Sequence, residues 1–339
     1  MPSESADTPH LGIAITGSNL TAVAAELLAA VGPYREVKAI TRRRTQTSLP
    51  VLFNGDEWGK KLKKMSPFSA RSQIRAFQDE ITRLTQGERY DCFLHHSKDP
   101  FSQLLAGHPL CRRFFYLEEG FTALTGNTFG RTGSNQLPKL LWKVKSPLFY
   151  SGMIHKYRSF FDTEDRKYGG AYALSKHAFK GFPGRIQLPA KEIIAELPLP
   201  GEIVIFLDSQ YFLGNCTEEA YTHAMLAGLA HLLKGPTQVA IKFHPSETLR
   251  ERKQRITDSI LSLPDVAGLT EVPGDFIAER MACAPGARIL VGTSAIGYFL
   301  GERGFSSFSF APRLKDSSEK YEKMLKQVPP EFSRVCQSI

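Results

Sequence analysis

Short runs of apolar, largely β-branched residues alternate with longer stretches of good helix formers along most of the chain. The short runs have the composition of buried strands, and several of the longer stretches have helical spacing. Strand, helix and strand in succession are typical of a doubly wound sheet. In the first half, the predicted strands are 11–16, 37–40, 90–96, 113–117 and 170–175, and the predicted helices are 20–31 and 69–84. In the second half, the predicted strands are 201–207, 237–241 and 288–292, and the predicted helices are 218–233, 249–261 and 295–301, with a shorter one at 275–281.

A proline-rich segment divides this pattern into two halves. Residues 181–200 contain four prolines, so we predict that this segment is an interdomain linker. It would join an N-terminal domain, 11–180, to a C-terminal domain, 201–339. A chain of 339 residues has room for two domains of ~150 residues each. We therefore expect an α/β protein with two doubly wound domains that face one cleft, preceded by a disordered N-terminus, 1–10.

Composition narrows the class of protein. Hydrophobic residues make up 42% and charged residues 23% of the chain, which is ordinary for a soluble globular protein. No apolar run approaches the ~20 residues that span a bilayer, and residues 1–10 have no signal-peptide pattern. The five cysteines lack Cys-x-x-Cys spacing, which argues for a reducing compartment and against a zinc site. We expect a cytoplasmic protein.

The net charge of +9 predicts a basic surface that attracts polyanions, anionic headgroups or acidic saccharides. Basic clusters occur at 42–44, 60–64 and 139–145. Solvated faces explain most such clusters, and the second would anchor to a membrane only weakly without an apolar partner face. Peripheral contact with the inner membrane face stays open. A nucleic-acid partner is not predicted, because the aromatic residues fall mostly inside predicted strands rather than on a basic face.

Lys242 and His244 follow an apolar run at the end of a predicted strand. Alternation places both side chains on the same side of the extended backbone, and Pro245 then ends the strand. Ligands bind outside the carboxyl ends of strands in open α/β sheets, so this pair is suited to an anion such as a phosphate. A solvated strand end is the alternative interpretation.

Two further strand ends carry candidate chemistry. Glu118, Glu119 and Gly120 place neighbouring carboxylates on a tight turn, where repulsion or burial raises at least one pKa and makes a general base. Thr293 and Ser294 open a predicted helix, where hydroxyls, backbone N–H groups and the helix dipole favour a phosphate. An exposed acidic turn and an ordinary N-cap are the alternatives.

The first predicted strand ends in a Gly-Ser turn at Ser18, which offers free backbone N–H groups at a helix start. The turn lacks the Gly-x-Gly-x-x-Gly pattern, so a dinucleotide site is not indicated. We predict no metal site at His95 and His96, because adjacent residues of a strand point to opposite faces. His96 is the better candidate of the two for lining a cleft.

The Glu-Glu-Gly, Lys-x-His-Pro and Gly-Thr-Ser motifs occur in this order between residues 118 and 294. Together they resemble the D/E-D/E-G, HP and S/T motifs of bacterial sialyltransferases, related families that include the polysialyltransferases. The resemblance implies a GT-B fold with two Rossmann-like domains. It also implies inverting, metal-independent transfer of a nonulosonic acid, sialic acid or Kdo-like, from a CMP-linked donor to a saccharide or glycolipid acceptor. No cofactor is implied.

The same resemblance implies roles for single residues. Glu119 resembles the general base for the acceptor hydroxyl, and His244 resembles the histidine that donates to the CMP phosphate. The sequence departs from the usual acidic motif in having Glu at both positions. The other residues implied to bind substrate or nucleotide, or to shape that site, are Glu118, Gly120, Lys242, Pro245, Glu279, Thr293 and Ser294. Ser18, at the Gly-Ser turn, is a further candidate on its own local grounds.

Two alternatives remain open from the sequence. A GT-B glycosyltransferase with a UDP-hexose donor would share the fold and the strand-end site. A non-catalytic polyanion-binding protein would use only the basic clusters. The acceptor, such as lipopolysaccharide, lipooligosaccharide or a capsular chain, cannot be chosen from sequence.

Overall fold

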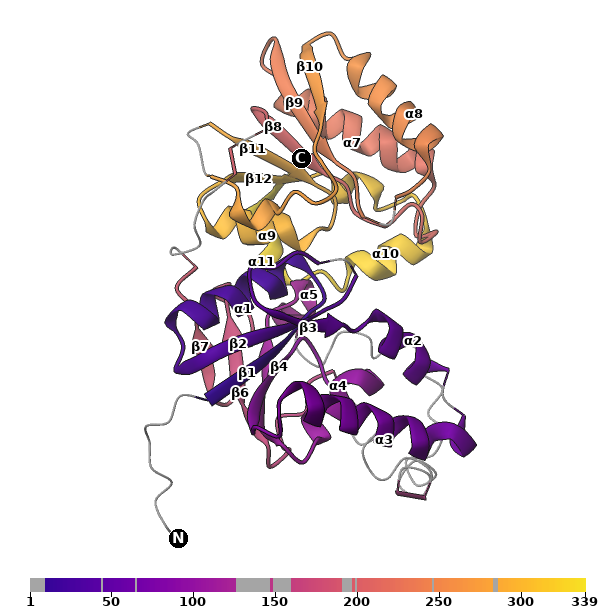
Figure 1. Ribbon diagram of the computed structural model, residues 1–339. Coiled ribbons are helices and arrows are strands. Elements are labelled where there is room, and N and C mark those ends of the chain that lie inside the picture. The colour runs from indigo at the N-terminus through magenta and orange to yellow at the C-terminus, as the bar shows by residue number, and fades with distance from the viewer. Residues whose placement is uncertain are drawn as a thin grey trace. The chain divides into compact units, whose positions relative to one another are not determined.

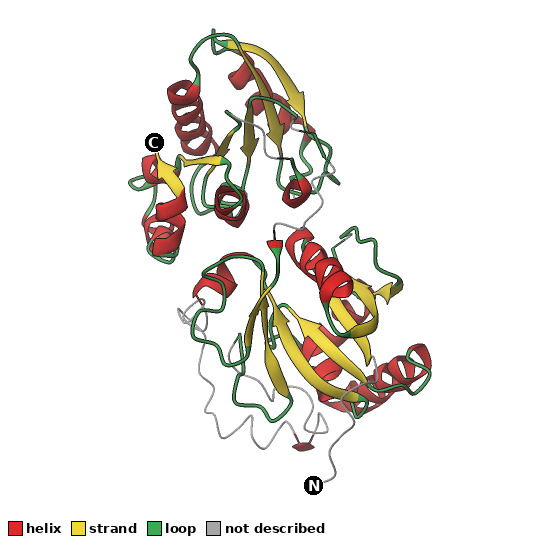
Figure 2. Cartoon of the chain, turned by 90° about the vertical axis from the view of Figure 1, so that its left-hand side faces the viewer, coloured by secondary structure: helices red, strands yellow, loops and turns green. Residues whose placement is uncertain are grey.

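The computed structural model describes residues 10–43, 45–64, 66–125, 147–148, 160–190, 197–198, 200–245, 247–282 and 286–339. The chain forms two compact units, Met1–Glu192 and Ile193–Ile339, and each contains one parallel β-sheet (Figure 1). Helices lie on both faces of each sheet (Figure 2). The predicted α/β class with two Rossmann-like domains is confirmed, and this is the domain content of the GT-B fold.

The sheet of the first unit has the strand order β3-β2-β1-β4-β5-β6-β7, and all neighbouring strands are parallel. Its strands are β1 (His10–Thr16), β2 (Tyr34–Thr41), β3 (Val51–Asn54), β4 (Tyr90–Leu94), β5 (Cys111–Leu117), β6 (Tyr168–Ala173) and β7 (Arg185–Gln187). Its helices are α1 (Asn19–Val31), α2 (Asp56–Lys63), α3 (Pro67–Leu84), α4 (Pro100–Gly107) and α5 (Gly120–Thr125). The strand order reverses between β1 and β4, which is where ligands bind in sheets of this kind.

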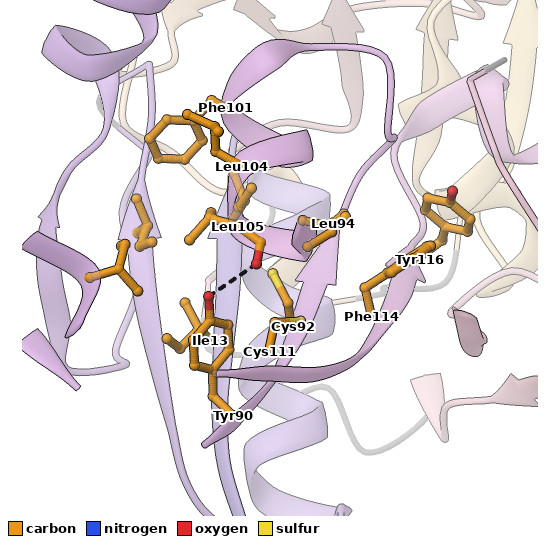
Figure 3. Close-up of a cluster of buried hydrophobic side chains, with 14 of the residues drawn as sticks. Ile13, Tyr90, Cys92, Leu94, Phe101, Leu104, Leu105, Cys111, Phe114 and Tyr116 are labelled. Carbon is orange, nitrogen blue, oxygen red and sulfur yellow. Dashed lines mark hydrogen bonds between the residues drawn. The ribbon is translucent and has the colours of Figure 1, made fainter. Parts of the chain in front are cut away.

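The core of the first unit forms because its central strands carry apolar side chains on both faces of the sheet. Every residue of β4 is buried, as expected of a parallel strand covered by helices on both sides. Tyr90 lies in this core with its hydroxyl satisfied, since it donates to the carbonyl oxygen of Leu105 in α4 at 3.0 Å (Figure 3). This contact fixes α4 against the sheet and so positions the loop between β4 and α4.

The sheet of the second unit has the order β10-β9-β8-β11-β12-β13, again with parallel neighbours. Its strands are β8 (Ile203–Phe206), β9 (Thr237–Lys242), β10 (Val266–Glu271), β11 (Arg288–Val291), β12 (Ser306–Ser309) and β13 (Cys336–Ser338). Its helices are α7 (Glu218–Leu232), α8 (Arg250–Leu261), α9 (Ala295–Glu302), α10 (Glu319–Leu325) and α11 (Pro330–Val335), with 3₁₀ turns η3 (Ala278–Arg280) and η4 (Ala311–Leu314). Here the order reverses between β8 and β11.

The prediction that 170–175 is the last strand of the first sheet was wrong. β7 follows it in the sequence and pairs with β6, inside the segment predicted as a linker. β3, β10, β12 and β13 were missed as well, and all of these strands lie toward the sheet edges. β7, β12 and β13 carry at most one apolar residue each, and no residue of β3 or β10 is fully buried. The pattern of burial that marks a central strand is absent from them.

Several predictions concern residues that the structure does not describe. They are residues 1–9 of the predicted N-terminus, the basic cluster 139–145, and part of the linker 181–200. No described helix has the length and hydropathy needed to cross a membrane.

Candidate active site

Three strand ends meet at the reversal point of the first sheet. β1, β4 and β5 are neighbours, and they end beside Gly17, His95 and Glu119. The His95 Nε2 atom lies 4.0 Å from Glu119 Oε2. A Cβ atom added to Gly17 would lie 3.8 Å from Glu119 Oε1 and 3.9 Å from His95 Cε1. The Glu119 side chain is 22% exposed, whereas that of His95 is 6% exposed.

The two carboxylates of the acidic motif differ in their surroundings. Glu118 is 2% exposed and accepts hydrogen bonds from the backbone N–H groups of Leu174 (2.8 Å) and Ser175 (2.7 Å). The Ser175 hydroxyl donates to its second oxygen. Glu118 therefore joins the end of β5 to the end of β6. Glu119 stays accessible, and the turn continues at Gly120, whose φ of +54° favours glycine.

Ser18 is the N-cap of α1, and its hydroxyl accepts from the Thr21 N–H. The Thr21 hydroxyl oxygen in turn accepts from the N–H groups of Gly17 (3.1 Å) and Ser18 (3.0 Å). The prediction of free N–H groups at this helix start was wrong for these two residues, because the reciprocal cap satisfies them. Sequence reasoning missed Thr21, although its spacing from Ser18 is that of a capping box.

The prediction that His95 and His96 point to opposite faces was wrong. β4 ends at Leu94, so both histidines lie beyond the strand, where side chains need not alternate. Their ring centroids are only 4.2 Å apart. Burial and the neighbouring His95 lower the pKa of His96 to about 3. Of the two, His95 contacts the candidate site more closely, because it lies beside Glu119.

In the second unit, Lys242 ends β9 and is buried. Its ammonium group donates to the carbonyl oxygens of Pro273 (3.1 Å) and Gly274 (2.9 Å). Burial lowers the pKa of Lys242, although the nearby carboxylates of Glu279 and Asp275 oppose the shift. The side chain thus holds the 273–274 turn against the carboxyl end of β9.

Glu279 lies in η3 and is also buried. Burial raises the pKa of its carboxyl to about 7, while its own backbone N–H, the Lys242 ammonium and the Arg303 guanidinium act in the opposite direction. The Arg303 guanidinium donates to the Glu279 carbonyl oxygen. The structure therefore brings Lys242 and Glu279, which are far apart in the sequence, into one electrostatic group.

This group makes stability depend on pH. The pKa of Glu279 rises from 4.5 to about 7 on folding, so the folded state binds the carboxyl proton more tightly than the unfolded state does. This preference stabilises the fold fully below about pH 4.5, and the stabilisation is lost as the pH rises through 7. The shift corresponds to roughly 3 kcal/mol. We expect Glu279→Gln to remove this loss, as measured by calorimetric unfolding at about pH 5 and about pH 8. Glu271→Gln, at an exposed carboxylate of the same unit, is the control. Equal pH dependence in wild type and Glu279→Gln would contradict the assignment.

His244 follows β9 and is half-buried, and its ring packs against Phe212 at a centroid distance of 5.4 Å. Its carbonyl oxygen accepts from the Glu247 N–H at 2.8 Å, which closes a turn around the exposed Pro245. Glu247 is itself buried and accepts from Arg252 at 3.0 Å. The turn that carries the imidazole is therefore fixed by Phe212 at its start and by the Glu247–Arg252 contact at its end. Phe212 was not predicted, and no sequence signal marks it.

Thr293 and Ser294 lie between β11 and α9, next to the end of β8. The Thr293 N–H and hydroxyl both donate to Asp208 Oδ2, at 2.7 and 2.9 Å. Gln210 Nε2 donates to the Thr293 hydroxyl oxygen at 3.1 Å. A side chain at Gly292 would collide with Asp208, whose Oδ2 would lie 2.6 Å from its Cβ. The N–H and hydroxyl of Thr293 are thus both hydrogen-bonded within the fold. The half-buried Ser294 is the N-cap of α9.

Comparison with known proteins finds structural likeness only. No family model and no curated protein matches the chain. The chain is similar to UDP-GlcNAc 2-epimerase from Neisseria meningitidis bound to UDP-GlcNAc, with 11% identity and a TM-score of 0.44 over 97% of this chain and 95% of that one. It is similar to the UDP-GlcNAc 2-epimerase from Methanocaldococcus jannaschii, with 9% identity and a TM-score of 0.44 over 97% of this chain and 88% of that one. It is also similar to a glycosyltransferase from Rickettsia africae, with 9% identity and a TM-score of 0.39 over 96% of each chain. Because these TM-scores are low, the similarities are not used to assign a function. The assignment of two Rossmann-like domains rests on the strand orders.

Proposed function

We propose that this protein is an inverting glycosyltransferase that moves a nonulosonic acid, sialic acid or Kdo-like, from a CMP-linked donor to a saccharide hydroxyl in bacterial surface glycan synthesis. One observation carries the proposal. Each of two strand-end motifs leaves one ionisable side chain accessible, Glu119 in the first unit and His244 in the second, while Glu118 and Lys242 beside them are buried and hydrogen-bonded. The motif resemblance assigns the chemistry to those two accessible residues.

In the proposed reaction, the Glu119 carboxylate takes the proton of the acceptor hydroxyl. The hydroxyl oxygen forms the new bond to the anomeric carbon as the bond to the CMP phosphate oxygen breaks, and CMP leaves with the electron pair. Glu118 acts as a positioning residue, because its hydrogen bonds to β6 fix the backbone that carries Glu119.

The departing phosphate gains negative charge, which the second unit is proposed to stabilise. His244 donates a hydrogen bond, and the Ser294 hydroxyl lies at the N-terminus of α9, where the helix dipole favours an anion. The Lys242 ammonium, which is hydrogen-bonded to the 273–274 turn, is proposed to add positive charge. Pro245 is proposed to fix the loop that carries His244. Glu279 is proposed to hold the ribose hydroxyls.

This proposal is tested by nucleotide binding. We expect CMP at ~100 times its Kd to stabilise the protein by about 2.7 kcal/mol, seen as a higher melting temperature. His244→Ala should abolish the shift, because the hydrogen bond to the phosphate is lost. Glu119→Gln should retain it, because Glu119 acts on the acceptor. His231→Ala, an exposed histidine at the end of α7, is the matched control.

The other outcomes are equally informative. Stabilisation by UDP but not by CMP would overturn the donor assignment in favour of a UDP-hexose. Stabilisation by neither nucleotide would overturn the proposed function. With CMP binding established, a screen of CMP-linked donors, scored by CMP release and product mass, identifies the sugar.

A further inference from the structure

Three potential metal ligands converge in the loop between β4 and α4. One ring nitrogen from each of His95 and His96 and one carboxylate oxygen of Asp99 all lie within 4.8 Å of one another. None of the three belongs to the proposed nucleotide site. The cluster lies within the first unit and adjoins Glu119 through His95.

The loop that carries these ligands is held in place by its neighbours. Asp99 is the N-cap of α4 and accepts from the N–H groups of Phe101 and Ser102. The Ser97 N–H donates to the Phe160 carbonyl oxygen at 2.8 Å, and the Tyr116 hydroxyl donates to the Ser97 hydroxyl oxygen at 3.0 Å. The donors are thus preorganised, as in metal sites whose outer contacts orient the ligands.

A second, independent feature points to a missing ligand. The His95 side chain is only 6% exposed, and its Nδ1 atom has no hydrogen-bond partner among the residues that the structure describes. Its Nε2 atom, at 4.0 Å from Glu119, is beyond hydrogen-bond distance as well. A buried polar atom without a partner is unfavourable, so this imidazole lacks the interaction that would stabilise it.

The charges described around the cluster balance. The Asp99 and Glu119 carboxylates lie beside it, with Glu119 Oε2 at 4.0 Å from His95 Nε2. Among the described residues, Arg42 Nη1 lies 3.5 Å from Asp99 Oδ1, and the Lys98 ammonium lies over the Phe160 ring, which also packs against His96. Two imidazoles and a carboxylate are the ligands of zinc and similar transition metals, whereas Mg²⁺ and Ca²⁺ prefer oxygen ligands only. We propose that His95, His96 and Asp99 bind a divalent transition-metal ion of the zinc class.

Binding affects hydrogen bonds at two of the ligands. The Lys98 N–H donates to His96 Nδ1 at 3.2 Å, and an ion at that nitrogen replaces this bond. The Ser102 hydroxyl donates to Asp99 Oδ2 at 2.6 Å, and an ion at that oxygen uses its other lone pair. His96 Nδ1 is 3.6 Å from Asp99 Oδ2, close to the separation of two ligands on one tetrahedral ion. The three ligand atoms lie within 4.8 Å of one another, so their side chains must move closer together to share one ion.

Equilibrium dialysis of the metal-free full-length chain against Zn²⁺ tests this proposal, with Co²⁺ as a spectroscopic probe. We expect one ion per chain and visible Co²⁺ bands typical of low coordination number, with no competition from Mg²⁺. His96→Gln should weaken binding by ~10- to 100-fold or more. Asp99→Ser should do the same while retaining an N-cap for α4. His177→Gln, in the same unit but outside the cluster, is the control.

The outcomes separate clearly. Binding that is unchanged in both His96→Gln and Asp99→Ser shows an adventitious ion only and overturns the proposal, as does the absence of binding by the wild-type chain. If Asp99→Ser fails to fold, His96→Gln decides alone. Since the readout is metal binding, the result is independent of whether CMP binds.

Discussion

Replacement of Glu119 by glutamine is expected to lower the rate of glycosyl transfer by ~10²- to 10⁴-fold, the usual contribution of a general base. The amide has nearly the shape of the carboxylate but cannot accept the proton of the acceptor hydroxyl. Glu119 is the accessible carboxylate at the point where β1, β4 and β5 end. The measurement is product formation from the CMP-linked donor that the screen identifies, followed by mass and by CMP release.

The matched control is Glu80→Gln, which removes a carboxylate on the surface of α3 that pairs only locally with Arg83. It should leave the transfer rate unchanged. CMP-induced stabilisation should be the same in Glu119→Gln as in wild type. Full transfer activity in Glu119→Gln would show that the base has been misassigned, even where CMP binding holds.

Replacement of the neighbouring Glu118 by alanine should instead reduce stability, by roughly 3 kcal/mol or more. The substitution removes the acceptor of the Leu174 and Ser175 N–H groups and leaves both buried donors without their partner. Urea denaturation followed by tryptophan fluorescence measures the effect. Trp58 packs against Phe77 in the core of the first unit, so its signal reports on the domain that contains Glu118.

Glu119→Ala is the paired control, because it deletes the accessible carboxylate next door. Its unfolding free energy should stay within about 0.5 kcal/mol of wild type, as for most surface substitutions. The opposite pattern, with Glu118→Ala as stable as wild type, would mean that the hydrogen bonds between β5 and β6 contribute little. Adjacent residues of one motif thus give opposite results in two assays, one for activity and one for stability.

The second unit also pairs a buried, hydrogen-bonded motif residue with a more accessible one. Lys242 and Thr293 come from motifs that suggested direct ligand contact, yet both are engaged in hydrogen bonds within the fold. His244 and Ser294 are the half-buried members of those motifs. A motif in this chain therefore combines one residue that secures the strand end with one that faces the substrate, in the proposed mechanism.

Sequence alone was sufficient for the central strands, the main helices and the α/β class. Burial on both faces of β8 and β11 favours continuous apolar runs, and the helix start at Thr217 uses a capping side chain, so both leave a local signal. Strands such as β12 and β13, nearer the sheet edge, left none. They are short and polar, and they exist because a neighbouring strand offers backbone hydrogen-bond partners.

For the site, the sequence indicated which strand ends carry ionisable groups, since those groups directly follow apolar runs. Only the tertiary structure decided which of them are accessible. Glu118 accepts hydrogen bonds from residues 56 and 57 positions away, and Thr293 donates to Asp208, 85 positions away. His95 meets Glu119 because β4 and β5 are adjacent in the sheet. Such contacts depend on strand order, which local side-chain periodicity does not encode.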